Sequence, residues 1–130
     1  MACKVLLADD SEIVRRAIRK RLAEHPDFEI VGETETFEET IRLVQLHKPR
    51  IVVLDIHLKD FATLQPFDFC AQVEPHCEVI GISIFIDEET EIVAQKLGVK
   101  KLIDKINLGE ELIPTILDLC RDDKAEVPQN

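Results

Sequence analysis

The chain has 130 residues and a formal net charge of −10, with 45% hydrophobic and 32% charged residues. This length predicts one domain with its own core, and the composition is that of an ordinary globular protein. The negative charge argues against nucleic-acid binding by this chain, because phosphates repel a polyanion. No apolar run is long enough to cross a bilayer and the N-terminus has no signal-peptide pattern, so we expect a cytoplasmic protein without membrane contact.

Apolar runs and helix signals alternate along the chain. The sequence predicts strands near residues 4–8, 28–31, 51–55, 78–83 and 101–103. Helical spacing and capping residues predict helices after Ser11, Thr36, Asp87 and Asn107, with a less clear helix between residues 59 and 75. Gly98 is placed to end the helix that follows Asp87. The chain turns polar at residue 121, which predicts a domain at 1–120 and a tail or linker at 121–130.

This alternation predicts an α/β fold, a doubly wound parallel sheet of five strands with helices on both faces. Residues 51–54 are apolar without alternation, as in a strand buried on both faces. In the flavodoxin-like strand order 2-1-3-4-5, the first and third strands are neighbours. Ligands bind at the carboxyl edge of such a sheet, between those two strands.

Polar side chains follow four strands of the predicted sheet. They are Asp9 and Asp10 after the first strand, Asp55 at the end of the third, Ser83 at the end of the fourth and Lys105 after the fifth. Three carboxylates at one edge repel one another, and Mg²⁺ would relieve this repulsion because it prefers oxygen ligands. An aspartate can act as a nucleophile, and phosphoryl transfer depends mainly on positioning and charge neutralisation. The set therefore suits transfer of a phosphoryl group to Asp55.

The sequence resembles the receiver domain of two-component response regulators across roughly residues 3–120. The resemblance lies in Asp9-Asp10, Asp55 within Val-Val-Leu-Asp-Ile, Ser83 within Gly-Ile-Ser, and Lys105 after Gly98-Val-Lys-Lys-Leu-Ile-Asp. It implies a (βα)₅ flavodoxin-like fold and a phosphoryl group accepted on Asp55 from a histidine kinase or phosphotransfer protein. It also implies Mg²⁺ held by Asp10, Asp55 and the backbone carbonyl of His57, with Asp9 helping. Ser83 and Lys105 would contact the phosphoryl oxygens.

The resemblance further implies a signalling switch whose only catalysis is its own phosphorylation and dephosphorylation, not an enzyme with an outside substrate. The stretch Leu-Leu-Ala-Asp-Asp-Ser resembles receivers with a helix-turn-helix output domain, so an output domain or downstream protein and transcription regulation are expected. The main alternative is a pseudo-receiver, an interaction module that keeps the fold and is not switched by phosphate. Dimerisation through the fourth and fifth helices stays open, because no residue pattern establishes it.

Three departures from the usual receiver pattern motivate that alternative. A bulky Ile84 follows Ser83, Leu102 replaces the usual switch aromatic, and Ile106 replaces the proline after Lys105. In the loop after the acceptor, a proline and a glycine are usual where this chain has Lys59 and Thr63. Variable positions that often set phosphate lifetime hold His57 and Phe85. The acceptor site thus matches the family, whereas the output half is atypical.

Three groups of residues remain outside this scheme. In the predicted first helix, apolar residues recur at helical spacing and basic residues lie on the other faces; the apolar set is Ile13, Val14, Ala17, Ile18 and Leu22. The basic set of this helix is either a solvated face or a docking surface for an acidic kinase domain: Arg15, Arg16, Arg19, Lys20 and Arg21. Three aromatic residues are expected to pack in the core rather than form an exposed patch: Phe61, Phe67 and Phe69. The cysteines lack metal-ligand spacing and are expected to be small buried thiols in a reducing compartment: Cys3, Cys70, Cys77 and Cys120.

Overall fold

The computed structural model describes residues 3–63, 66–73 and 77–126. They form a five-stranded sheet in the order β2-β1-β3-β4-β5, and every pairing is parallel. The strands are β1 (Cys3–Ala8), β2 (Phe28–Thr34), β3 (Ile51–Asp55), β4 (Glu78–Ser83) and β5 (Val99–Asp104). This order confirms the predicted flavodoxin-like fold, although the second and fifth strands are longer than predicted.

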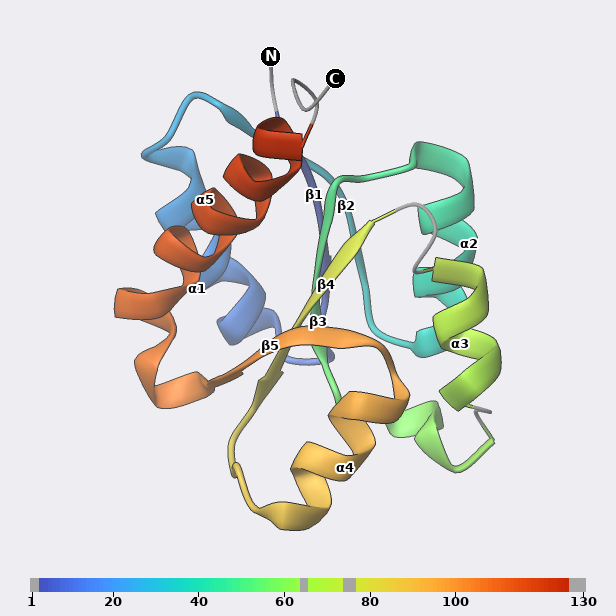
Figure 1. Ribbon diagram of the computed structural model, residues 1–130. Coiled ribbons are helices and arrows are strands. Elements are labelled where there is room, and N and C mark those ends of the chain that lie inside the picture. The colour runs from blue at the N-terminus through green and yellow to red at the C-terminus, as the bar shows by residue number, and fades with distance from the viewer. Residues whose placement is uncertain (1–2, 64–65, 74–76, 127–130) are drawn as a thin grey trace.

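Helices connect the strands and cover both faces of the sheet. They are α1 (Glu12–Ala23), α2 (Phe37–His47), α3 (Pro66–Val73), α4 (Glu88–Lys96) and α5 (Leu108–Glu126). Short 3₁₀ turns add η1 (Lys59–Thr63) and η2 (Lys105–Asn107). Figure 1 shows α1 and α5 on one side of the sheet, with α2 and α3 on the other. The segment between residues 59 and 75, predicted as one helix, therefore contains η1 and α3. Helix α5 continues past residue 120 into the segment predicted as a tail.

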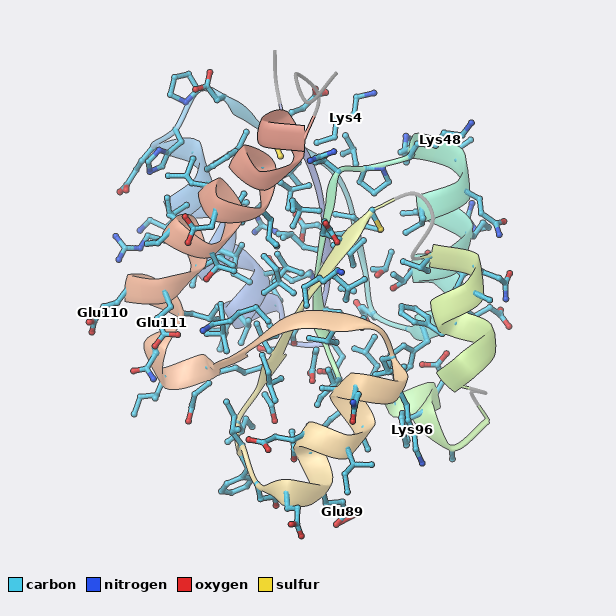
Figure 2. All side chains as sticks on the ribbon, in the orientation of Figure 1. Lys4, Lys48, Glu89, Lys96, Glu110 and Glu111 are labelled. Atoms are coloured by element: carbon cyan, nitrogen blue, oxygen red, sulfur yellow. The ribbon has the colours of Figure 1, made fainter. Side chains whose placement is uncertain are left out.

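Alternate residues of each strand face two separate apolar cores. In β1, Leu6 belongs to the core beneath α2, α3 and α4, whereas Val5 and Leu7 belong to the core beneath α1 and α5. Every residue of β3 is buried, as its unbroken apolar run predicted. Charged side chains such as Lys48, Glu89 and Glu110 lie on the outside of the molecule (Figure 2). Among the described residues, no helix has the length and apolar character needed to span a membrane.

An aromatic cluster fixes the segment that follows β3. The ring of Phe37 lies 5.5 Å from that of Phe69 and 6.0 Å from that of Phe61, measured between ring centroids. Phe69 is fully buried and Phe61 is partly buried against the same core, which confirms core packing for these two residues. The side chain of Phe67 lies outside the described residues. Asp60 in η1 accepts hydrogen bonds from the backbone N–H of Phe37 and Glu38, at 2.9 and 3.2 Å, and so anchors this turn to the start of α2.

The caps predicted at Ser11, Thr36 and Asp87 form at the helix ends, whereas Asn107 is the last residue of η2, directly before α5. The side chains of Ser11, Thr36 and Asp87 each accept a hydrogen bond from a backbone N–H in the first turn of α1, α2 and α4. Gly98 follows α4 with a φ of 77°, a left-handed conformation that glycine adopts without steric cost. Lys48 takes a left-handed conformation at the end of α2, with a φ of 50°. These caps set where each helix leaves the sheet edge.

Gly81 lies in β4 where a side chain has no room. A Cβ atom there would lie 3.0 Å from Val99 Cγ1 and 3.2 Å from Ile56 Cγ2. We expect Gly81→Ala to lower the free energy of unfolding in urea by about 2 kcal/mol, because overpacking strains a dense core. Gly109→Ala is the matched control, since its methyl group would meet the flexible Arg21 side chain. Equal losses of stability in the two variants would contradict the packing argument.

Candidate functional site

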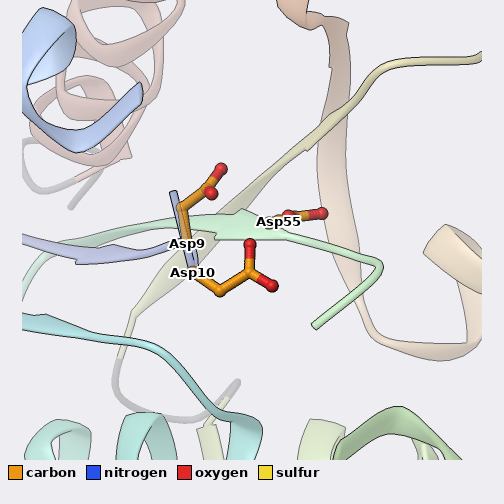
Figure 3. Close-up of side chains that lie close together, drawn as sticks. All are labelled: Asp9, Asp10 and Asp55. Carbon is orange, nitrogen blue, oxygen red and sulfur yellow. The ribbon is translucent and has the colours of Figure 1, made fainter. Parts of the chain in front are cut away.

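The carboxyl ends of β1, β3 and β5 bring four charged side chains together. Figure 3 shows Asp9 and Asp10, from the end of β1, close to Asp55 at the end of β3. A carboxylate oxygen of each lies within 4.8 Å of those of the other two. The ammonium Nζ of Lys105, which follows β5, lies 2.9 Å from Asp9 Oδ2 and 3.3 Å from Asp55 Oδ2. The structure therefore brings together Asp9, Asp10, Asp55 and Lys105, the four charged residues that the sequence places at the strand ends.

Burial makes this cluster electrostatically costly. Asp9 is 1% exposed and Asp55 is 5% exposed, whereas Asp10 is exposed. Burial is the main cause that raises the pKa of Asp9, and the charge of Asp55 raises it further; the close Lys105 ammonium and a hydrogen bond from the Ser11 N–H offset this only in part. Asp9 Oδ2 receives no well-aligned hydrogen bond from the described residues, so the nearby ammonium acts on it as a point charge.

Lys105 is held as a cation by its neighbours. Burial lowers its pKa, but the close contact with Asp9 and the charges of Asp55 and Asp9 outweigh burial and raise the pKa above its ordinary value. The ammonium does not return the pKa of Asp9 to its ordinary value, because burial of the carboxylate outweighs the attraction and the nearby charge of Asp55 raises the pKa further. A divalent cation would supply the missing positive charge. Three carboxylates are the hard oxygen ligands that Mg²⁺ accepts, so this donor set fits the predicted metal.

Hydrogen bonds hold the side chains at the ends of β3 and β4. The backbone N–H of His57 donates to Asp55 Oδ1 at 2.8 Å. On the next strand, Ser83 is fully buried, donates its hydroxyl proton to the Phe85 carbonyl at 2.6 Å and lies 3.1 Å from His57 Nε2. None of the described hydrogen bonds joins Ser83 to Asp55. The role of the His57 carbonyl as a metal ligand stays a prediction.

Arg15 is a site residue that the sequence analysis placed on the wrong face of its helix. It is 8% exposed, and its Nη1 donates to the backbone carbonyl of Asp9. Its Nε donates to Glu33 Oε1 and its Nη2 to Glu12 Oε1, both at 2.8 Å. The guanidinium thus holds the acidic loop from its backbone side. Ile13, which was assigned to the apolar face, is 81% exposed instead.

A positional signal for this contact was present in the sequence. Arg15 shares the buried face of α1 with Ile18 and Leu22, at spacings of three and four residues. Arg19 also pairs with Glu33, with Nη1 2.6 Å from Oε1. Arg15 and Arg19 form ion pairs with Glu12 and Glu33 of the same chain. A docking surface on α1 would instead use its exposed basic residues: Arg16, Lys20 and Arg21.

The atypical residues around the site point mostly into solvent. Ile84 is 66% exposed and Ile106 is 84% exposed, while Leu102 is partly buried against the core beneath α4. The turn after Lys105 is capped by Asp104, whose Oδ1 accepts a hydrogen bond from the Ile106 N–H at 3.0 Å. Every peptide bond in the described part of the chain is trans. The loop therefore holds Lys105 in place without the usual proline.

Known proteins resemble this chain over most of its length. Residues 5–117 match the family model of the response regulator receiver domain. The chain is 31% identical over 112 residues to YhcZ of Bacillus subtilis, an uncharacterized transcriptional regulatory protein, covering 86% of this chain and 52% of YhcZ. It is 26% identical over 129 residues to the response regulator protein VraR of Staphylococcus aureus, covering 99% of this chain and 62% of VraR. The chain thus spans less than two thirds of the length of either relative.

Solved structures share the same fold at low sequence identity. The signal receiver domain of NarL from Mycobacterium tuberculosis superposes with a TM-score of 0.80 at 20% identity, covering 92% of this chain and 97% of that one. The signal receiver domain of a modulated diguanylate cyclase from Desulfovibrio desulfuricans superposes with a TM-score of 0.81 at 21% identity, covering 97% and 99%. These likenesses agree with the observed strand order.

Arg15 and Arg19 offer a matched pair of substitutions. Both bind Glu12 and Glu33, but among the described hydrogen bonds only Arg15 reaches the carbonyl of Asp9. We expect Arg15→Gln to lower the free energy of unfolding by about 2 kcal/mol, because it removes a buried charged donor. Arg19→Gln should cost less, since exposed ion pairs contribute little. Arg15→Gln should also weaken Mg²⁺ binding measured by calorimetry; equal effects of the two substitutions on Mg²⁺ binding would contradict this role.

The burial of Asp9 predicts how charge and metal affect stability. A raised pKa means that the fold disfavours the ionised form, so metal-free stability falls as pH rises from the unfolded pKa through the folded one. At neutral pH, Asp9→Asn should therefore raise Tm without Mg²⁺ by about 3 °C and reduce the further gain that Mg²⁺ gives. Asp10→Asn, which removes an exposed charge, should raise Tm less. A lower Tm for metal-free Asp9→Asn would contradict the argument.

Proposed function

The chain belongs to the response regulator receiver domain family, and from this premise we propose that Asp55 accepts a phosphoryl group from a histidine kinase or a phosphotransfer protein. The observation that carries the proposal is the excess of carboxylates at the sheet edge. The Lys105 ammonium contacts the buried carboxylates of Asp9 and Asp55. A carboxylate oxygen of Asp10 lies within 4.8 Å of an oxygen of each of them. A structural ion pair needs only one partner of each sign, so the surplus negative charge supports a site for a cation and a phosphoryl group.

The geometry supports Asp55 as the nucleophile. Its Oδ1 is held by the His57 N–H and its Oδ2 by Lys105, which together fix the orientation of the carboxylate. As a carboxylate oxygen bonds to phosphorus, the bond from phosphorus to the donor's imidazole nitrogen breaks, and that nitrogen keeps the electron pair. Lys105 would then turn toward the phosphoryl oxygens, where its positive charge offsets the new negative charge.

Mg²⁺ would be held by the carboxylates of Asp9, Asp10 and Asp55, with the His57 backbone carbonyl as the further ligand that the family resemblance implies. When bound, it would neutralise the carboxylates and the incoming phosphoryl oxygens. The raised pKa of Asp9 supports this assignment, because burial leaves the carboxylate in need of positive charge. The protein's own residues contribute position: Arg15 holds the acidic loop by the Asp9 carbonyl, and the Ser11 N–H holds Asp9 Oδ1 at 2.8 Å.

Ser83 would couple phosphorylation to a change of conformation. Its hydroxyl proton is bound to the Phe85 carbonyl, so a hydrogen bond to a phosphoryl oxygen requires that this contact break. The loop after β4 would then be released from Ser83, and this loop carries the exposed side chains of Ile84 and Phe85. The contact of His57 Nε2 with Ser83 Oγ would also have to adjust. An aspartyl phosphate would thereby alter an apolar surface next to α4.

The proposed catalysis is directed at the protein itself, as phosphorylation of Asp55 and later hydrolysis, without an outside substrate. We place the protein in the cytoplasm and propose that it signals to an output domain or a downstream protein. Transcription regulation as the output is supported by the description of YhcZ as a transcriptional regulatory protein. The net charge of −10 supports an output that does not use nucleic-acid contact by this chain.

Intact-mass measurement after incubation with acetyl phosphate tests the proposal. We expect the unmodified chain to gain one phosphoryl group in the presence of Mg²⁺ and none with EDTA. Asp55→Asn should gain none, because an amide is not a nucleophile of this kind, while its carbonyl can still accept the His57 N–H. Circular dichroism should show that the variant is folded. A folded unmodified chain that gains no phosphoryl group and binds no beryllofluoride would overturn the proposal in favour of a pseudo-receiver.

A further inference from the structure

Two cysteines from distant parts of the chain meet at one point of the fold. Cys3 is the first residue of β1 and Cys120 lies in α5, yet their sulfur atoms are 3.0 Å apart. Both are free thiols and both are partly buried against the core beneath α1 and α5. The phosphoryl-transfer scheme uses neither residue, since both lie outside the acidic cluster.

We propose that Cys3 and Cys120 are a modification site, at which a low-molecular-weight disulfide such as oxidised glutathione converts the two thiols into an intramolecular disulfide bond. The proposal does not depend on phosphorylation of Asp55. Its first support is proximity. A disulfide bond is about 2.0 Å long, so the two sulfurs need to approach by only about 1 Å.

The fold has already brought the two thiols together. In an unfolded chain, joining residues 117 positions apart requires closure of a very long loop, which is entropically costly. In the folded protein, β1 is paired on both sides within the sheet and α5 packs beside α1, so both cysteines are held in place. The pair should therefore form a bond much more readily in the folded state than in the unfolded state.

The surroundings of the pair set the ionisation of Cys3. Burial and the contact with Cys120 raise the pKa of Cys3 to about 12, although the charge of Arg50 lowers it. Cys3 is therefore mostly a protonated thiol at neutral pH, and it reacts through its minor thiolate form.

The reaction balances as two thiol–disulfide exchanges. The Cys120 thiolate attacks one sulfur of oxidised glutathione, forming a mixed disulfide and releasing one glutathione thiolate. The Cys3 thiolate then attacks the Cys120 sulfur of that mixed disulfide, forming the protein disulfide and releasing the second glutathione. Two protein thiols are oxidised, one glutathione disulfide is reduced, and the two protons of the cysteines pass to the released thiolates. An excess of reduced glutathione reverses both steps.

Cys77 is an internal control for accessibility. It is 7% exposed, its thiol contacts the Val73 carbonyl at 3.5 Å, and burial raises its pKa to about 12. The experiment therefore uses four chains: the unmodified one, Cys3→Ser, Cys120→Ser, and a Cys70→Ser/Cys77→Ala variant that keeps only the proposed pair. Each is incubated with oxidised and reduced glutathione at a series of ratios, quenched with acid, alkylated and analysed by peptide mass spectrometry.

We expect a peptide cross-link between Cys3 and Cys120 in the unmodified chain and in the Cys70→Ser/Cys77→Ala variant. Cys3→Ser should instead keep a mixed disulfide with glutathione on Cys120. The equilibrium constant for the bridge should be at least about tenfold higher in buffer than in urea, since the native fold holds the pair together. The bridged protein should also have a higher Tm, and dithiothreitol should reverse this gain.

Three results would overturn the proposal. They are a stable mixed disulfide on Cys120 while Cys3 stays reduced, a cross-link to Cys70 or Cys77 in the folded chain, and an equilibrium constant that is the same in buffer and in urea. Failure of this proposal leaves the phosphoryl-acceptor proposal intact, because Asp55 and the acidic pair take no part in the exchange. Phosphorylation by acetyl phosphate, measured on the same samples, keeps the two questions separate.

Discussion

The contact of the Lys105 ammonium with the buried carboxylates of Asp9 and Asp55 is the interaction on which the site depends. A parallel sheet delivers the ends of β1, β3 and β5 to one edge, so the fold itself concentrates the charges there. Burial disfavours the ionised carboxylates, and the single ammonium offsets this only in part. Burial raises the pKa of Asp9, and the carboxylates of Asp9 and Asp55 outweigh burial and raise the pKa of Lys105. Binding of a divalent cation would lower the free energy of such a site, and this supports the proposed function.

Asp9 links two charge networks with different tasks. Its side chain faces Lys105 and the acceptor, while its backbone carbonyl receives the Arg15 guanidinium. Arg15 is in turn neutralised by Glu12 and Glu33, so the positive charge that holds the loop is balanced away from the acceptor. In the proposed function, binding of Mg²⁺ and a phosphoryl group would change the charge of the first network. The second network would hold the loop in position during that change.

The sequence was sufficient to predict most of the fold and the grouping of charged residues at one sheet edge, for identifiable physical reasons. The apolar run of β3 is typical of a strand buried on both faces, and parallel strands bring Asp9, Asp10, Asp55 and Lys105 to one edge. Hydrophobic periodicity failed for α1, because it ranks side chains by polarity and misses a buried hydrogen bond; Ile13 was placed inside and Arg15 outside. The contacts of Ser83 and the meeting of Cys3 with Cys120 depend on how loops and the last helix settle, which spacing along the chain does not determine.

A crystal structure of the protein with Mg²⁺ and beryllofluoride would show whether Asp55 is a phosphoryl acceptor. Beryllofluoride mimics a phosphoryl group on an aspartate without the need for a donor. We predict beryllofluoride bonded to the Asp55 carboxylate and Mg²⁺ against the carboxylates of Asp9, Asp10 and Asp55. It also predicts Lys105 turned toward a fluoride and the Ser83 hydroxyl released from the Phe85 carbonyl. An adduct-free Asp55, with Lys105 and Ser83 in their present contacts at saturating Mg²⁺ and beryllofluoride, would contradict it.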